Sequence, residues 1–437
     1  MRTLLMALFF LSFPFANAQK LTIEEAETQT YYSFINADYK TTIKIGNEAL
    51  KQGIDSYYIR YRLGVSYYAT TNYEAAILHL ERAKSLDSND PTLLEYLYYA
   101  YDFSNRTEKA QLLSEIFPDD LKAKINPKQK RFKSVAAEVG MLQTNNFKNS
   151  NSNGILGDNA YAQGTFYSDV VFGNVLLTNQ ISKNFKLENS INVVTNTSNT
   201  MFQFKFPTIQ TNVFTDKNNY FQWNAIGTYY LKGFHIGAGF GLYNSSYKSY
   251  LLPVNFPVSQ EFISTKTTNT NYSGSLSISK NFKYFEPKIG MSYTNLSDNK
   301  TVCIDGSVSY FPFGNLHFYG NSKIGFVKNN SESNIIYSQL VGAKLTKKIW
   351  VEGYGAYGNH TNYITDNGLF VFNTPNKINW YAGANLNLYF KKIDISLGYG
   401  IQERAASYYT ELNITTSNTT NYTYNYNLFK TKIVWKF

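Results

Sequence analysis

The sequence predicts a chain of two unlike parts: a short α-solenoid over residues 19–125 and an antiparallel transmembrane β-barrel of about 14 strands over residues 132–437. Three observations predict this combination. A spacing of 34 residues recurs in the first part, and strands of alternating polarity, joined by alternately short and long connections, fill the second. The chain then ends on a strand with one aromatic face and one lysine face.

Composition separates the chain from ordinary cytosolic enzymes. Aromatic residues make up 17% of the sequence and charged residues only 16%, which is typical of a sheet with aromatic girdles. Mean hydropathy is −0.33, and beyond the N-terminus no apolar run is long enough for a transmembrane helix. Cys303 is the only cysteine in the sequence, which excludes an internal disulfide and a cysteine metal cluster.

Residues 1–18 have the pattern of a secretory signal peptide. Arg2 supplies the positive charge, an apolar core runs from Leu4 to Phe15, and Ala16-Asn17-Ala18 forms the cleavage site. We expect the mature chain to begin at Gln19. No cysteine follows the cleavage site, so a lipoprotein anchor is not expected.

Charge divides between the two parts. Residues 19–125 carry 12 Lys and Arg against 16 Asp and Glu, whereas residues 126–437 carry 28 against 15. The lysines of the second part stand singly in turns and strands, without the patch that nucleic-acid binding requires. They are interpreted as facing anionic lipid head groups, a polyanionic ligand or the acidic first part.

One well-formed repeat carries the helical prediction. Its residues are Leu63, Gly64, Tyr67, Tyr73, Ala76, Ala83 and Pro91, and pairs 34 residues apart flank it at Tyr39 and Tyr73, Ala49 and Ala83, and Ala76 and Ala110. The pattern resembles the tetratricopeptide repeat (TPR), in which Gly64 would let two helices approach closely. The resemblance implies three repeats, or roughly six helices, with Thr30 and Tyr98 replacing the Gly in the outer two.

Tetratricopeptide domains usually bind peptides or helices in a groove, so the resemblance implies a protein partner. Arg60 and Arg62 are candidate polar contacts of that groove, whereas His79 and most of the tyrosines are interpreted as packing the helices. Beyond this part, Pro118, Pro127 and a run of lysines break the pattern, and residues 126–131 are interpreted as a basic linker.

From residue 132 onward, the sequence predicts strands that alternate with connecting segments. Six tight turns alternate with seven longer polar stretches near 145–160, 197–219, 246–270, 295–300, 328–334, 359–378 and 411–420. The fourteen strands expected are 132–144, 161–181, 186–196, 220–231, 234–245, 271–279, 284–294, 301–311, 316–327, 335–346, 349–358, 379–390, 393–408 and 421–437. An even number puts both barrel ends on the short-turn side, which is periplasmic in bacterial outer-membrane barrels.

The last strand places Phe429, Ile433 and Trp435 opposite its lysines. It resembles the C-terminal signal read by the outer-membrane assembly machinery: Lys430, Trp435 and Phe437 match, while Lys432 stands where a Gly is usual. Tyr422, Tyr424 and Tyr426 have the opposite parity to the aromatic face. Either a bulge lies near Asn427-Leu428 or these tyrosines stand above the membrane.

Charged residues on inward faces near the short turns are the candidate site. They are His235, Glu286, Lys288, His317, Glu352, Asp394 and Lys436. Three readings stay open: a charge network that holds the barrel mouth together, a constriction or docking ring, or a hydrolase site. No catalysis is expected, because no outward-facing His lies beside a Ser. The four histidines have no metal-ligand spacing, so no metal and no cofactor are expected.

The whole chain resembles Gram-negative proteins in which periplasmic tetratricopeptide repeats precede an outer-membrane barrel. These include the exporters of poly-N-acetylglucosamine and cellulose and the smaller YaiO-like barrels. The resemblance implies an outer-membrane location with the first part in the periplasm. Two functions remain open: passage of a solute or polymer, or a non-conducting anchor for a protein-binding scaffold. An enzyme acting on lipid or glycan is a third, weaker alternative.

Overall fold

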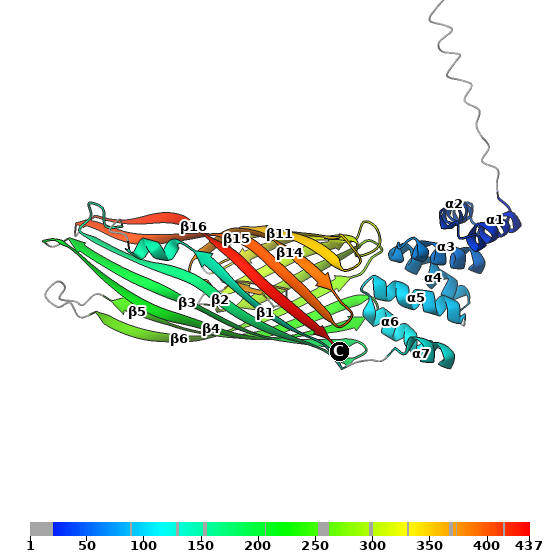
Figure 1. The fold of residues 1–437 in the computed structure, drawn as a ribbon, viewed down its shortest axis with the longest axis horizontal. Helices are drawn as coiled ribbons and strands as arrows, with labels where there is room; N and C mark the ends of the chain where they lie inside the picture. Colours follow the sequence, from blue (N-terminus) through cyan, green and yellow to red (C-terminus); the bar gives the residue numbers. More distant parts are fainter. Residues whose placement is uncertain are drawn as a thin grey trace, which may run out of the picture. The chain divides into compact units, whose positions relative to one another are not determined.

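A computed structural model describes residues 21–87, 90–127, 131–151, 155–205, 207–251, 262–296, 300–329, 332–366, 370–372, 374–413 and 416–437. The predicted signal peptide lies outside these residues. The chain divides into two compact units, Met1–Ile125 and Asn126–Phe437 (Figure 1). Among the helices of the described residues, none is both long and apolar enough to cross a membrane.

The first unit is helical. Its described α-helices are α1 (Ile23–Ile35), α2 (Tyr39–Lys51), α3 (Tyr57–Ala69), α4 (Tyr73–Leu86), α5 (Pro91–Phe103), α6 (Thr107–Leu113) and α7 (Asp119–Ile125). Side-chain caps begin several of them: Thr22 and Glu25 form a capping box on α1, and Asp90 caps α5, whose first residue is Pro91. Helix α7 was not expected, because Pro118 and Pro127 were interpreted as breaking the helical pattern. The two prolines lie on either side of α7, so a short helix fits between them.

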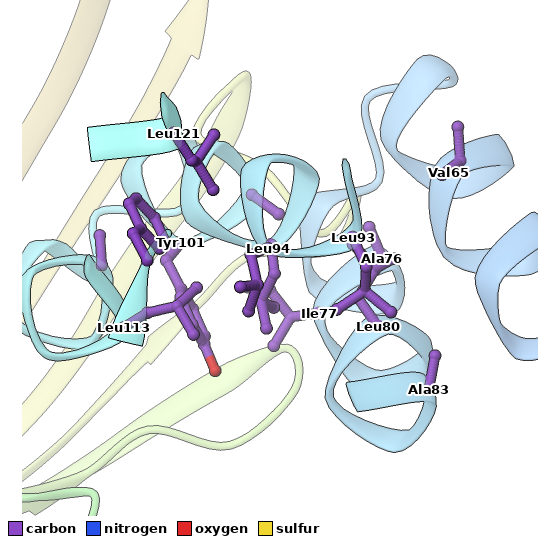
Figure 2. Close-up of a cluster of buried hydrophobic side chains, with 14 residues drawn as sticks. Val65, Ala76, Ile77, Leu80, Ala83, Leu93, Leu94, Tyr101, Leu113 and Leu121 are labelled. Carbon is purple, nitrogen blue, oxygen red and sulfur yellow. The ribbon is translucent and has the colours of Figure 1, made fainter. Parts of the chain in front are cut away.

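Successive helices of this unit pack against one another in chain order. Gly64 of α3 packs directly against α4: a Cβ there would lie 2.5 Å from Leu80 Cγ. Ala76 and Ala83 are fully buried, and Figure 2 shows both in the cluster formed with leucines of α4 and α5. The Tyr57 hydroxyl donates to the Asp90 carboxylate over 2.5 Å, which ties α3 to the start of α5. That these helices are tetratricopeptide repeats stays a prediction.

The second unit is a closed antiparallel barrel of fourteen strands, as predicted. The strands are β1 (Phe132–Thr144), β2 (Tyr161–Ser182), β3 (Phe185–Lys205), β4 (Ile209–Leu231), β5 (Phe234–Leu251), β6 (Ile263–Lys280), β7 (Phe285–Thr294), β8 (Thr301–Tyr310), β9 (Phe318–Lys328), β10 (Ser333–Lys344), β11 (Ile349–Tyr357), β14 (Lys377–Tyr389), β15 (Ile393–Asn413) and β16 (Thr416–Lys436). Each strand pairs with its neighbours in the barrel, and β1 closes it against β16. Two short strands, β12 (Tyr363–Thr365) and β13 (Phe370–Phe372), pair only with each other.

Three of the predicted long loops are wrong, because the strands continue through them. β3 and β4 pair without interruption up to Lys205 and Ile209, and β15 pairs with β16 up to Asn413 and Thr416. β5 and β6 likewise remain paired to Leu251 and Ile263. The Thr, Asn and Ser residues there were interpreted as loop, but their side chains bond across strands, as Asn218 does to Ser198 over 3.0 Å.

The barrel wall is therefore uneven in height. Strands β7 to β11 have 9 to 12 residues, whereas β2, β3, β4, β15 and β16 have 21 to 23. Beyond the end of β14, β15 pairs with β2 from Tyr408 to Glu411, so the long strands form a sheet above the short ones. A 3-10 turn, η2 (Asn146–Asn151), lies between β1 and β2.

Of the two alternatives for the last strand, the bulge near Asn427-Leu428 is wrong. β16 keeps one register with β15 from Ser417 to Trp435. From Thr420 to Lys430, and again from Lys432 to Lys436, exposure alternates with the odd-numbered residues exposed, so these face outward. Tyr422, Tyr424 and Tyr426 share the inner face with the lysines. Tyr426 is fully buried, its hydroxyl donates to the Ser168 carbonyl over 2.9 Å, and the Arg404 guanidinium lies over its ring. Their parity differs from that of Phe429 and Trp435 because they line the inner face of a strand without a bulge.

The outer face carries exposed apolar side chains on all sides. Aromatic residues near the short turns are Phe132, Tyr229, Phe282, Phe285, Phe313, Phe390, Trp435 and Phe437. A second group, farther along the same strands, is Phe221, Phe240, Tyr272, Phe326, Tyr337, Tyr357, Tyr399 and Phe429. Exposed aliphatic residues such as Leu276, Ile289, Ile304 and Ile433 lie between the two groups.

Candidate functional site: an occluded barrel interior

The connection between β11 and β14 lies inside the barrel. Tyr363 and Phe372 pack against Cys303 of β8, Val327 of β9 and Ile336 of β10. These wall residues have the opposite parity to the exposed apolar residues of the same strands. The β12–β13 hairpin therefore contacts the inner face.

The same hairpin reaches the other side of the interior. Ile364 and Val371 pack with Tyr243 of β5 and with Leu296, which follows β7. In barrel order β5 is separated from β11 by five strands. A segment that starts at β11 and touches β5 crosses the interior, and it does so near the long-loop ends of the short strands.

Lys323 of β9 fastens the hairpin to the wall. Its ammonium lies 3.6 Å from the Asp305 carboxylate of β8 and 3.7 Å from that of Asp366, next to β12, and it also bonds the Thr365 hydroxyl. The Lys323 and Asp305 side chains are each 10% exposed. Removing Lys323 would leave the Asp305 carboxylate without its cation where water is scarce, which is costly.

Beside the hairpin lies a cavity of about 380 Å³. Its wall includes four aromatic rings from β11, β12, β13 and β14, namely Tyr354, Tyr363, Phe372 and Tyr381. Polar lining residues include His360, Asn385, Gln402, Lys323 and Lys430. The size falls within the range of small-molecule sites.

The predicted charged residues separate into local groups and do not form one ring. His235 Nδ1 lies 3.5 Å from the Glu286 carboxylate, which also accepts a 2.6 Å bond from Ser279. The Asp394 carboxylate pairs with the Lys436 ammonium at 2.6 Å.

The other predicted charged residues lie on further strands. The His317 ring contacts Lys344 at 3.0 Å, and Lys288 shares its strand face with Glu286.

Glu352 is held by three neutral donors. The Tyr319 hydroxyl donates to one oxygen over 2.6 Å, and the side-chain amides of Asn385 and Asn387 donate to the other over 3.3 and 3.0 Å. These bonds connect β9, β11 and β14, and they fix the Asn385 amide, which also lines the cavity. Within the described part of the chain, no group of three or more His, Cys, Asp or Glu is placed to hold a metal ion.

The candidate groove residues of the helical unit, Arg60 and Arg62, are each bonded to other residues of that unit. Arg60 forms 2.7 and 3.0 Å bonds to Asp55 and contacts His79, which stacks on Tyr67. Arg62 donates to the Glu27 carbonyl over 2.8 Å, and its guanidinium lies over the rings of Tyr31 and Tyr58.

These contacts leave an exposed aromatic surface. Tyr31 is 47% and Tyr58 55% exposed, on α1 and α3. The Tyr73 ring packs against Tyr68 and Phe103, and Leu63 is fully buried.

The proposed assembly-signal residues lie on both faces of β16. Trp435 and Phe437 are about half exposed on the outer face. The Lys430 ammonium lies 5.5 Å from the Tyr354 ring centroid inside the barrel.

Comparison with known proteins gives remote likenesses only. No known protein family matches the chain, and no curated protein matches it in sequence. Among solved structures, the Pseudomonas putida toluene transporter TodX has a TM-score of 0.45 at 7% identity, covering 70% of this chain and 90% of that one. A Pseudomonas aeruginosa FadL homologue has 0.44 at 9%, with the same coverage. A bacterial polysaccharide outer-membrane secretin has 0.34 at 8%, covering 70% and 99%. Since these scores lie below 0.5, the likenesses do not fix the function of this chain.

The hairpin and its cavity are the features that sequence reasoning missed. Residues 359–378 were interpreted as one polar loop. The signal that could have found them is the pair of short apolar stretches Tyr363-Ile364 and Phe370-Val371-Phe372. A loop that faced only solvent would have little use for five bulky apolar residues.

Proposed function

We propose that this chain is an outer-membrane barrel that gives passage to a solute, with a periplasmic helical unit that recruits a protein partner. The observation that carries the proposal is the apolar outer face around a polar interior. Along β4 and β16 the two aromatic groups lie eight residues apart, as at Phe221 and Tyr229 or Phe429 and Phe437. At about 3.3 Å per residue and a tilt of about 40°, this separation is about 20 Å, close to the height of a transmembrane barrel's apolar band.

Strand length supports the same placement. The ten residues of β7 and of β8 would rise about 25 Å at that tilt, just enough to cross the apolar band. The longer strands would then stand beyond the membrane on the long-loop side. Lysines at the short turns lie over aromatic rings, as Lys280 does over Phe234 at 4.5 Å, where lipid phosphates would meet them.

The hairpin keeps the second function open. A filled barrel would serve as a non-conducting anchor, and β12–β13 occupies interior space. We favour passage because the hairpin is bound by a few named contacts and leaves a cavity beside it. A barrel of fourteen strands can enclose an aqueous path when no segment obstructs it.

Planar-bilayer recording of the full chain tests the choice. In Lys323→Met the bonds to Asp305 and Asp366 are lost, so we expect longer or more frequent openings than in the wild type. Lys436→Met is the matched control, because it breaks an ion pair of the same kind at Asp394, away from the hairpin. A variant with residues 359–376 replaced by a short Gly-Ser linker should conduct continuously. If that variant folds and stays silent, the anchor function replaces passage.

The partner-recruiting role is supported by the exposed Tyr31 and Tyr58 rings on either side of Arg62. Immobilised residues 19–125 should retain a specific protein from a periplasmic extract of the source cell. Tyr58→Ala should weaken this capture, whereas Leu86→Ala, which removes a similarly exposed apolar side chain from α4, should not. Equal capture by both variants would contradict the assignment of this surface.

A further inference from the structure

Three residues that line the 380 Å³ cavity each have a buried polar side-chain atom without a hydrogen-bond partner. They are Tyr354 Oη, His360 Nε2 and Asn385 Oδ1. His360 is fully buried. An unpartnered buried polar atom costs about 1–3 kcal/mol, so three on residues that line one cavity point to a ligand that would bond them.

The hydrogen-bond roles of these atoms are set by their neighbours. His360 Nδ1 lies 3.4 Å from the Ile378 carbonyl, which can only accept, so Nδ1 carries a proton. Burial favours the uncharged ring, in which Nε2 is then an acceptor. Asn385 uses its amide nitrogen on Glu352, which leaves its oxygen as an acceptor. The Tyr354 hydroxyl can donate or accept. The ligand must therefore bring hydrogen-bond donors.

The cavity and its surroundings carry no excess of positive charge. Lys323 is paired with Asp305 and Asp366, and the Lys430 ammonium lies over the Tyr354 ring. Counting Glu352, which lies behind Asn385, two cations are opposed by three anions, so no excess positive charge is left to attract an anion. A carboxylate or phosphate would also bring only acceptors to sites that need donors.

The aromatic rings define the rest of the ligand. Tyr381 lies 5.8 Å from Phe372 with nearly parallel planes, and 5.2 Å from the His360 ring. Aromatic faces carry partial negative charge and attract the weakly positive C–H groups of a saturated ring. A plain hydrocarbon would satisfy these faces but would leave the three polar atoms unpaired.

We propose that this cavity is a binding site for a neutral, polyhydroxylated ring compound, that is, a mono- or disaccharide unit. Its hydroxyl groups donate to His360 Nε2 and Asn385 Oδ1 and bond the Tyr354 hydroxyl, while a face of C–H groups lies against Tyr381. The site rests on the proposed function only in that it names the class of solute the barrel would carry. Binding itself requires no conduction.

Calorimetric titration of the full chain tests the site, in a detergent without a sugar head group so that the detergent does not compete. D-glucose and maltose are the probes, and hexanol and hexanoate represent the hydrocarbon and the anion. We expect a sugar to bind more tightly than either. Tyr354→Phe removes one hydroxyl from the cavity and should weaken sugar binding about fivefold. Tyr381→Ala removes a ring face and should weaken it further.

Tyr357→Phe is the matched control, since it deletes a hydroxyl from the same strand on the outer face and should leave sugar binding unchanged. Sugar binding that Tyr354→Phe and Tyr381→Ala both leave unchanged would overturn the site. So would tighter binding of hexanol or hexanoate than of either sugar.

Swelling of proteoliposomes in maltose separates this inference from the proposed function. If sugar binds and responds to Tyr354→Phe but the liposomes do not swell, passage fails and the site stands. If the liposomes swell but no sugar binds, passage stands and the site fails.

Discussion

The buried ion pair of the helical unit gives a prediction whose size follows from the structure. Glu74 of α4 bonds Arg106, which precedes α6, and the two side chains are 6% and 8% exposed. Arg106→Met would leave the Glu74 carboxylate without its cation away from water. Breaking a buried pair in this way costs about 3–5 kcal/mol of unfolding free energy.

The pH dependence of this loss shows whether the charge of Glu74 causes it. Burial raises the pKa of Glu74 from 4.5 to about 7, although Arg106 opposes the rise. A carboxyl whose pKa is higher in the folded state binds more protons there, so its stabilising effect is present below the unfolded pKa and is lost as pH rises through the folded one. Without Arg106 the folded pKa rises further. The loss in Arg106→Met should therefore be largest at about pH 8. At about pH 5, where Glu74 is protonated with or without Arg106, the loss should be smaller by up to about 1.4 kcal/mol, the equivalent of the one pH unit between pH 8 and the folded pKa of about 7.

Urea unfolding of the full chain in detergent, followed by the far-ultraviolet circular dichroism of the helices, measures this loss. Lys51→Met is the control, because Lys51 and Glu48 form an exposed pair at 3.8 Å, which should contribute at most about 1 kcal/mol. A loss in Arg106→Met that is no larger than in the control, or that is the same at both pH values, would refute the reasoning.

Three further predictions concern packing, the outer face and acid stability. Gly64→Val should lower the unfolding free energy of the helical unit by about 1–3 kcal/mol in the same urea assay, because its side chain meets Leu80; unchanged stability would show that the helices can separate. Leu276 lies on the outer face of β6 and is 66% exposed. Leu276→Lys should lower the unfolding free energy of the barrel by about 2–4 kcal/mol and reduce the folded band on cold gel electrophoresis, whereas Ser277→Lys, on the inner face, should not. Equal effects of the two substitutions would contradict the membrane placement. Hydrogen bonds from Arg60 and pairing with Arg82 lower the pKa of Asp55 below 3.8, so its contribution to stability is present above that value and is lost as pH falls through the folded pKa; Asp55→Asn should flatten this acid loss in pH-dependent melting curves.

The sequence was sufficient for the barrel because its pattern is local. Alternation along each strand and the alternating connections predicted fourteen strands, and the structure has them. Strand ends on the short-turn side were predicted closely, since Lys232-Gly233 and similar turns mark them. Ends on the long-loop side were not, because Thr and Asn serve equally well in an exposed strand and in a loop.

The interior could not be predicted from the same pattern. Alternation places Lys323, Asp305 and Glu352 on inward faces, but it does not say which of them meet across the barrel. Lys323 was not singled out, although it binds the hairpin, because its partner Asp366 lies in a segment without strand periodicity. Contacts of this kind depend on the closure of the barrel and on where a long connection folds.

The contacts of the hairpin indicate that it is a movable part of the barrel and not a permanent plug. Its inner contacts are apolar at Ile364, Tyr363 and Phe372, whereas the Lys323 contacts are polar and charged. A permanent plug would gain most from apolar packing alone, since replacing a buried ion pair with apolar residues is often neutral or stabilising. The ion pairs instead give the hairpin a defined position that can be released by breaking few bonds. His360 lies in the same connection as the hairpin, so a solute bound to it would contact the segment that moves when the path opens. If the solute binds the open arrangement more tightly than the closed one, binding in the cavity and opening of the path favour each other.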